Sequence, residues 1–152
     1  MTEETQKASS ESSGANAPKL HPIQLVAVQP LVLSISAHAD PDDMKDFEGV
    51  VKLESTHTEY DELNKIIQVK VRALIPRELD LPLSLHVEIA GVFQVDEDRF
   101  SKDNVDAWAT RNAPYLLYPF LREQIFSLSV RIGATGIIVP LFEIPTFRHS
   151  PK

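Results

Sequence analysis

The side chains that could support metal or acid–base chemistry in this chain are five histidines and a set of scattered carboxylates. The histidines are His21, His38, His57, His86 and His149. A zinc or iron site needs several such ligands at close spacing. The nearest approach to that spacing is His86 with Glu88, which lie two residues apart on the polar face of a predicted strand. A solvated strand face explains this pair, and we therefore predict no metal site.

The remaining motif searches also point away from an enzyme. The densest acidic group comprises Asp40, Asp42, Asp43 and Asp46, without the glycine and terminal glutamate of a calcium loop. The sequence has only five glycines, and it contains neither a Walker pattern nor a Gly-x-Ser-x-Gly pattern. It has no cysteine and therefore no thiol nucleophile. Arg122 and Glu123 are neighbours on a predicted helix and point in different directions, so we expect them to act in subunit contacts. We predict no catalytic residue and no cofactor.

Length and charge restrict the class further. A chain of 152 residues is one domain by size. The formal net charge of −7 opposes nucleic-acid binding and is compatible with basic polypeptide partners. The polar N-terminus does not resemble a secretory signal, and no apolar run reaches the roughly 18–20 residues that cross a bilayer. We expect a cytoplasmic protein that does not insert into membranes.

The N-terminal region differs in composition from the rest. It is rich in Ser, Glu, Thr, Ala and Asn and contains no apolar cluster. Such a segment cannot bury enough apolar surface to offset the entropy lost on ordering. We predict a disordered tail over residues 1–19 and a single domain over residues 20–152.

Four stretches with apolar residues at every second position predict strands between residues 23 and 96. The apolar positions are Leu31, Leu33, Ile35 and Ala37, with Ile23 and Leu25 opening the same strand; Phe47, Gly49, Val51, Leu53 and Ser55; Ile67, Val69, Val71, Ala73 and Ile75; and Leu83, Leu85, Val87, Ile89, Gly91, Phe93 and Val95. Period two with one polar face is typical of an antiparallel sheet covered on one side. The Asp-Pro-Asp-Asp sequence that begins at Asp40 indicates a turn after the first strand.

Helical spacing replaces this alternation after Asp96. Ser101 and Asp103 are candidate N-caps of a short helix through Trp108. A long helix is predicted over residues 115–132, with Pro119 tolerated near its start and Gly133 as its stop. The predicted fold class is therefore α+β, a four-stranded, mainly antiparallel sheet packed with one long helix.

The long helix carries two apolar stripes. One consists of Leu117, Leu121, Ile125, Leu128 and Ile132, and the other of Leu116, Phe120, Phe126 and Val130. One face of a sheet can cover only one stripe, so we expect another subunit to cover the second. Phe126 and Leu128 are the predicted interface residues of a homo-oligomer.

The segment after the helix is apolar and interrupted by prolines. It contains Ile137, Ile138, Val139, Leu141, Phe142 and Ile144, with Pro140 and Pro145 among them. The prolines deny regular strand pairing. These side chains either pack into the core or line a groove for a ligand, and the pattern leaves both open.

The same region resembles the SecB family of bacterial export chaperones. The resemblance depends on Leu-Tyr-Pro-Phe-Leu-Arg-Glu at residues 117–123, on Arg131-x-Gly133, and on the proline-spaced stretch that ends at Phe147. It covers about a fifth of the chain closely. A looser similarity extends back to Ala-Gly-Val-Phe at residues 90–93.

This resemblance implies a SecB-like fold that assembles as a tetramer, a dimer of dimers with the long helices packed between sheets. It implies ATP-independent holding of unfolded polypeptides in hydrophobic grooves, in a role linked to protein export. Carried over position by position, the groove residues are Val51, Leu53, Tyr118, Leu121, Ile138, Leu141 and Phe142.

The chain departs from the family pattern at the positions that dock the SecA motor. The acidic residues expected there are replaced by His86, Pro30 and Ser34, although Glu88 restores a charge two places from His86. The family pattern also includes a second helix and an acidic tail, where this sequence has only residues 148–152 after Phe147. Client holding is therefore better indicated than delivery to SecA. Two alternatives remain: a dedicated chaperone of one partner, such as an antitoxin, and a structural oligomer that binds no client.

Overall fold

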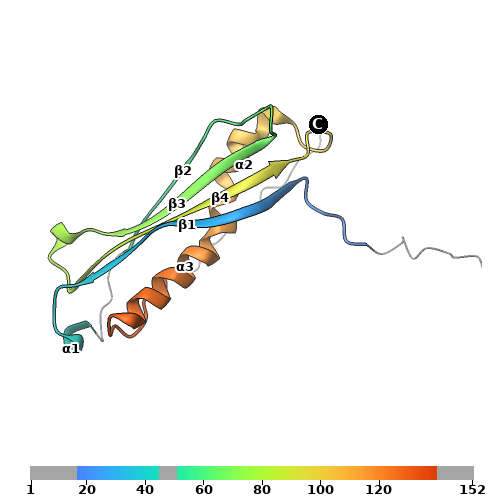
Figure 1. Ribbon diagram of the computed structural model, residues 1–152. Helices are drawn as coiled ribbons and strands as arrows, with labels where there is room; N and C mark the ends of the chain where they lie inside the picture. Colours follow the sequence, from blue (N-terminus) through green and yellow to red (C-terminus); the bar gives the residue numbers. More distant parts are fainter. Residues whose placement is uncertain (1–16, 45–50, 140–152) are drawn as a thin grey trace, which may run out of the picture.

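The structure is a computed structural model that describes residues 17–44 and 51–139. Its strands are β1 (Ile23–Ala37), β2 (Lys52–His57), β3 (Ile66–Ile75) and β4 (Leu83–Val95). Its α-helices are the single turn α1 (Pro41–Met44), α2 (Val105–Arg111) and α3 (Ala113–Arg131), and short 3-10 turns span Arg77–Leu79 and Lys102–Asn104. The four strands and the long helix α3 confirm the predicted α+β class (Figure 1).

The strands form one antiparallel sheet in the order β1-β4-β3-β2. Strands β2, β3 and β4 follow one another as a meander with short connections, as expected for neighbouring antiparallel strands. The chain places β1 beside β4, on the far side of the sheet from β2. Strands β1 and β2 are therefore the two edges.

Strand β1 does not keep the single alternation that we predicted from its sequence. Leu25 pairs with Phe93, but Val28 pairs with Gly91 and Leu33 with Val87, because register shifts occur between Leu25 and Ala27 and between Pro30 and Val32. Each shift inserts one residue into β1 and reverses the face of every later side chain. Leu31 lies in the second shift and has no partner in this register, whereas Leu33 pairs with Val87.

Helix α3 covers one face of the sheet and packs mainly on β3 and β4 (Figure 1). The helical residues that face the sheet are buried, and they are Ala113, Leu117, Leu121, Ile125 and Ser129. The approach is closest at Gly91 of β4, where an added Cβ would lie 2.5 Å from Cδ2 of Leu117. Glycine at this position therefore permits the helix to lie against the centre of the sheet.

The short helix α2 closes one end of the core. The ring of Trp108 meets the ring of Phe93 edge-on, with centroids 5.0 Å apart. The predicted start of this helix was too early, because residues Lys102–Asn104 form a 3-10 turn and α2 begins at Val105. Ser101 lies at the cap position of that turn but makes no side-chain capping bond.

Helix α3 begins at Ala113, two residues before the predicted start, with Pro114 in its first turn. Pro119 therefore lies inside the helix. The prediction that Pro119 lies near the start of the helix was wrong, because its position is beyond the four N–H groups that a helix start leaves free. The predicted stop is confirmed, since Gly133 follows the helix with a φ of +89°.

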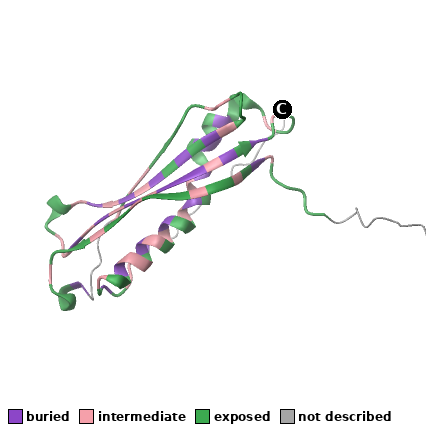
Figure 2. Ribbon diagram, viewed as in Figure 1, coloured by how far each residue is buried: buried purple, intermediate pink, exposed green. Residues whose placement is uncertain are grey.

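The contact between the sheet and α3 is buried, whereas the surface of α3 that faces away from the sheet is largely exposed (Figure 2). On the outer surface of α3, Leu116, Phe120 and Val130 are each between 44% and 49% exposed. Phe47, Gly49 and most of the predicted 1–19 tail lie outside the described residues. Among the described residues, no helix is long and apolar enough to cross a membrane.

Candidate functional site

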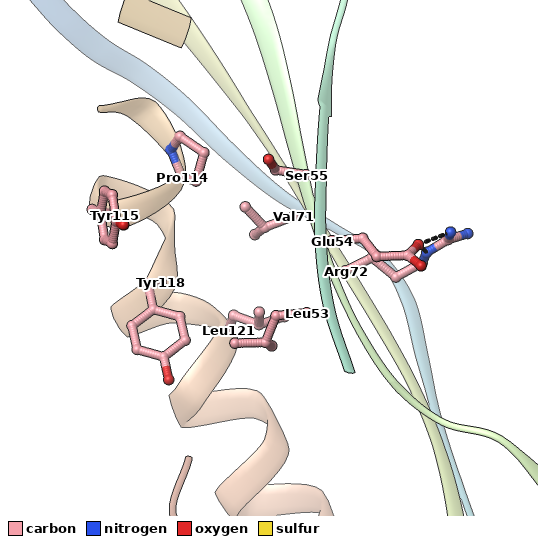
Figure 3. Close-up of a pocket in the computed structure, with 9 residues that line it drawn as sticks. All are labelled: Leu53, Glu54, Ser55, Val71, Arg72, Pro114, Tyr115, Tyr118 and Leu121. Atoms are coloured by element: carbon pink, nitrogen blue, oxygen red, sulfur yellow. Dashed lines mark hydrogen bonds and ion pairs between the residues drawn. The ribbon is translucent and has the colours of Figure 1, made fainter. Parts of the chain in front are cut away.

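A cavity of about 300 Å³ opens between α3 and the β2 edge of the sheet. We call it the first cavity, and Figure 3 shows its lining. It is lined by Leu53, Glu54, Ser55, Val71, Arg72, Pro114, Tyr115, Tyr118 and Leu121. The cavity exists because α3 packs mainly on β3 and β4, so the edge strand β2 extends past the helix. Its apolar lining can accept aliphatic or aromatic side chains.

The charged residues of the first cavity neutralise one another. Glu54 pairs with Lys52, whose Nζ lies 2.9 Å from its Oε1, and with Arg72, which is its cross-strand partner. Hydrogen bonds from Lys52 and then Arg72 lower the pKa of Glu54 to about 2. Burial raises the pKa of the Tyr118 hydroxyl, so this ring stays neutral near pH 7. The cavity therefore offers apolar contact with little net charge.

A second cavity of about 370 Å³ lies further along α3. Its lining residues are Pro119, Arg122, Glu123, Phe126, Ile137, Ile138 and Val139. One wall belongs to residues 133–139, which we call the post-helical segment. Gly136 has a φ of +96°, and an added Cβ would lie 2.6 Å from Cε2 of Phe126, so a larger residue here would require strained backbone and a shift of the ring.

Besides the backbone bonds from Gly133 and Ala134 to the last turn of α3, two side-chain hydrogen bonds hold the post-helical segment against the helix. The amide N–H of Ile137 donates to Oγ of Ser129 at 2.8 Å, and Nε of Arg122 donates to the carbonyl oxygen of Val139 at 2.9 Å. Ser129 is fully buried and its hydroxyl in turn donates to the carbonyl oxygen of Phe126. The segment therefore runs back along the helix and brings Val139 close to the turn that contains Tyr118 and Arg122.

The structure brings together some of the predicted groove residues and separates others. Leu53, Tyr118 and Leu121 line the first cavity, whereas Ile138 lines the second. Val51 is half-buried against the core and lines neither cavity. Leu141 and Phe142 lie outside the described residues.

The two predicted interface residues occupy different environments. Phe126 is 45% exposed and lines the second cavity, whereas Leu128 is half-buried and packs against the core. At this level of α3 the fully buried residue that faces the sheet is Ser129 rather than Leu128.

Several cavity residues were not among those that we predicted. Val71 and Arg72 line the first cavity because β3 pairs with β2 at Ser55 and Glu54, a register that sequence alone does not supply. Tyr115 could have been found, since it lies three residues before Tyr118 and hence on a neighbouring part of the same helix face.

The described residues contain no group of three or more His, Cys, Asp and Glu placed to hold a metal ion. His86 and Glu88 do approach each other, with 3.2 Å between Nε2 and Oε2, but Glu88 also pairs with Lys70 at 3.1 Å. Neither the first nor the second cavity is lined by a described histidine. Their linings are suited to binding side chains by apolar contact.

No protein-family profile matches this sequence, and a search of the curated proteins found no significant match. Among solved structures, the chain is similar to the Mycobacterium tuberculosis SecB-like chaperone Rv1957, solved in complex with a ChAD peptide from the HigA1 antitoxin. The TM-score is 0.64 at 17% sequence identity, and the match covers 80% of this chain and 91% of the other. This similarity establishes a SecB-like fold.

A second similar structure is a protein of unknown function from Streptococcus agalactiae. It has a TM-score of 0.42 and 13% identity, and the match covers 80% of this chain and 94% of that one.

Proposed function

We propose that this protein is a SecB-related, ATP-independent chaperone of the cytoplasm, which holds non-native polypeptide segments against α3. The observation on which the proposal rests is the apolar first cavity, open along α3 beside β2 in a SecB-like fold. A second apolar cavity continues along the same helix. No nucleotide, metal or other cofactor is needed for binding of this kind.

The energetics favour weak, unselective holding of extended chains. Apolar burial contributes about 25 cal/mol per Å² before the costs of ordering the client are subtracted. Leu53 and Tyr118 would supply contact area in the first cavity, with Leu121 as its buried floor. Ile138 would contact the client in the second cavity, and we retain Val51, Leu141 and Phe142 as proposed contacts.

The same proposal includes assembly into a homotetramer, a dimer of dimers. Leu116, Phe120 and Val130 form an exposed apolar surface on α3, which a monomer would leave in water. Association through this surface would bury it, and Phe126 lies at its border with the second cavity. A structural oligomer without clients would use this surface alone and would leave both cavities without a role.

A dedicated partner is the second candidate function. It is favoured by the similarity to Rv1957, whose structure contains a peptide from an antitoxin. Export is the broader alternative, but three SecA-docking positions of the family are occupied here by Pro30, Ser34 and His86. Delivery of clients to SecA is therefore not part of the proposal.

The test is suppression of aggregation of a slowly folding client protein, without nucleotide. The wild type is compared with a triple variant, Ile138→Ser, Leu141→Ser and Phe142→Ser, and we expect the variant to suppress less while its oligomer size is unchanged. A matched control replaces exposed leucines outside both cavities, Leu20→Ser, Leu63→Ser and Leu79→Ser, and should behave as wild type.

Each outcome separates the candidates. No suppression by the wild type would contradict general holding and favour a dedicated partner or a structural oligomer. Suppression that survives the triple substitution would move the site toward Val51 and Leu53. A native pull-down from the host that returns one dominant partner, rather than many, would favour the dedicated chaperone.

A further inference from the structure

We propose that an extended client segment joins the sheet at the β2 edge as a fifth strand, antiparallel to β2, and places alternate side chains in the first cavity. The inference rests on the proposed function, because it assumes that the first cavity receives side chains of a polypeptide. It adds an interaction surface, the main-chain groups of β2, and a class of partner, a polypeptide whose backbone is extended and unpaired.

One side of β2 has no strand beside it among the described residues. The sheet order β1-β4-β3-β2 puts β2 at an edge, and within those residues it pairs with β3 alone. Its six residues, Lys52–His57, include no proline and pair with β3 without a register shift. An edge of this kind presents a row of N–H and C=O groups with which a further strand can pair.

The pairing pattern identifies the residues of β2 that direct these groups outward. The amide N–H of Thr58 donates to the carbonyl oxygen of Gln68 at 2.9 Å, so this pair bonds across the two strands. Bonded and non-bonded pairs alternate along an antiparallel ladder. Glu54 therefore bonds to β3, whereas the N–H and C=O groups of Leu53 and Ser55 point to the open edge.

The same two residues direct their side chains toward α3. Leu53 and Ser55 line the first cavity, whereas Glu54 between them points away from α3 and pairs with Arg72 (Figure 3). Residues directly opposite each other on paired strands carry their side chains on the same face. A client residue opposite Leu53 or Ser55 would therefore bond to β2 through its backbone and face the first cavity with its side chain.

The dimensions of an added strand suit this cavity. Paired strands lie about 4.8 Å apart, and side chains on one face of a strand follow one another roughly every 7 Å. Helix α3 packs mainly on β3 and β4, so space remains beside β2 for such side chains. Tyr115 and Tyr118 of α3 form the wall of the cavity opposite β2, and apolar client residues would pack on their rings (Figure 3).

The open edge of β2 is short. At its C-terminal end, Nε2 of His57 lies 3.1 Å from Oγ1 of Thr110, so α2 bounds the edge there. Leu53 and Ser55 can exchange about four main-chain hydrogen bonds with an antiparallel client. Because each of these bonds replaces bonds to water, so small a number favours weak and reversible holding.

Main-chain pairing also distinguishes non-native chains from folded ones. An unfolded segment presents free N–H and C=O groups, whereas nearly all buried backbone groups of a folded protein are already bonded. The client is then specified by an extended backbone with apolar residues at alternate positions, rather than by one particular sequence.

The test uses three fluorescently labelled peptides with the same alternating apolar and polar residues. One is unmethylated, one carries backbone N-methyl groups on apolar residues, and one carries them on polar residues. Antiparallel pairing uses the N–H groups of the apolar residues that lie opposite Leu53 and Ser55. Fluorescence anisotropy with the full-length protein should therefore show that methylation of apolar residues weakens binding about tenfold more than methylation of polar residues.

A proline in β2 tests the same bonds from the side of the protein. Ser55→Pro removes an N–H that points to the open edge and no bond to β3, so the sheet should remain folded. Ser55→Ala changes the side chain alone. Ser55→Pro should bind the unmethylated peptide about tenfold more weakly than Ser55→Ala, at the same oligomer size. If Ser55→Pro does not fold, the methylated peptides decide the question.

Equal binding of the two methylated peptides would overturn strand addition while leaving client holding intact. Weaker binding of the peptide methylated on polar residues would overturn the antiparallel orientation, because a strand parallel to β2 bonds through those residues. A changed oligomer size in Ser55→Pro would assign the edge to a second copy of this chain instead. If the unmethylated peptide does not bind and no client aggregation is suppressed, the proposed function fails together with this inference.

Discussion

The two sides of α3 have similar side chains and opposite environments. Leu117 faces the sheet and is fully buried, whereas its neighbour Leu116 faces away and is 49% exposed. The inner stripe packs so closely that Gly91 of β4 has no room for a Cβ. The outer stripe meets nothing among the described residues that would bury it to the same extent. Apolar character alone therefore does not say which surface stabilises the subunit and which is available to partners.

The largest expected effect is a difference in the free energy of unfolding between substitutions in the inner stripe and in the outer stripe. Leu117→Ala removes a fully buried side chain and should lower the free energy of unfolding by about 2–5 kcal/mol. Leu116→Ala changes an exposed residue and should cost the folded subunit about 0.5 kcal/mol or less. Urea unfolding of both variants measures the difference. Similar losses in the free energy of unfolding for the two variants would contradict the division into a buried and an exposed stripe.

A second substitution tests whether the outer stripe forms the contact between subunits. Phe120→Asp should leave the subunit folded, because Phe120 is 44% exposed, but should place a charge in the proposed subunit contact. Light scattering should then show dissociation of an oligomer toward the 17.0 kDa subunit. The wild type running as a stable monomer at micromolar concentration would remove the proposed tetramer.

A smaller effect is expected from the polar residue of the inner stripe. Ser129→Ala removes the hydroxyl that accepts from the Ile137 amide and should cost about 1 kcal/mol. The amide of Ile137 should also exchange its hydrogen faster, because the post-helical segment is released from α3. Unchanged exchange at this amide would show that the bond does not hold the segment, and Ser127→Ala on the exposed side provides the control.

The smallest effect concerns acid stability at the edge of the first cavity. The pKa of Glu54 falls from 4.5 to about 2 on folding, so the folded state binds fewer protons there. Its ion pairs therefore stabilise the fold above about pH 4.5, and this contribution is lost as the pH falls toward 2. Glu54→Gln should make stability less steeply dependent on pH in that window. An unchanged acid slope would indicate that solvent screens these exposed pairs fully.

Much of the fold follows from local sequence patterns. The alternation in β3 and β4 and the helical spacing after Asp96 predicted the α+β class, because period and burial are linked within one element. Gly133 predicted the end of α3 for a similarly local reason. The site residues came from the family resemblance rather than from a local pattern. Leu53, Tyr118 and Leu121 line the first cavity, and their contact with a client stays a prediction.

What the sequence by itself determined was the type of each element, the two apolar stripes of α3 and the apolar character of several residues that line the first cavity. Only the tertiary structure decided that β1 pairs with β4, that two register shifts reverse its faces, and that α3 leaves the β2 edge uncovered. The physical reason is that side-chain period is a property of a single element. Register, edge position and the line along which a helix crosses a sheet depend on contacts between residues far apart in the chain.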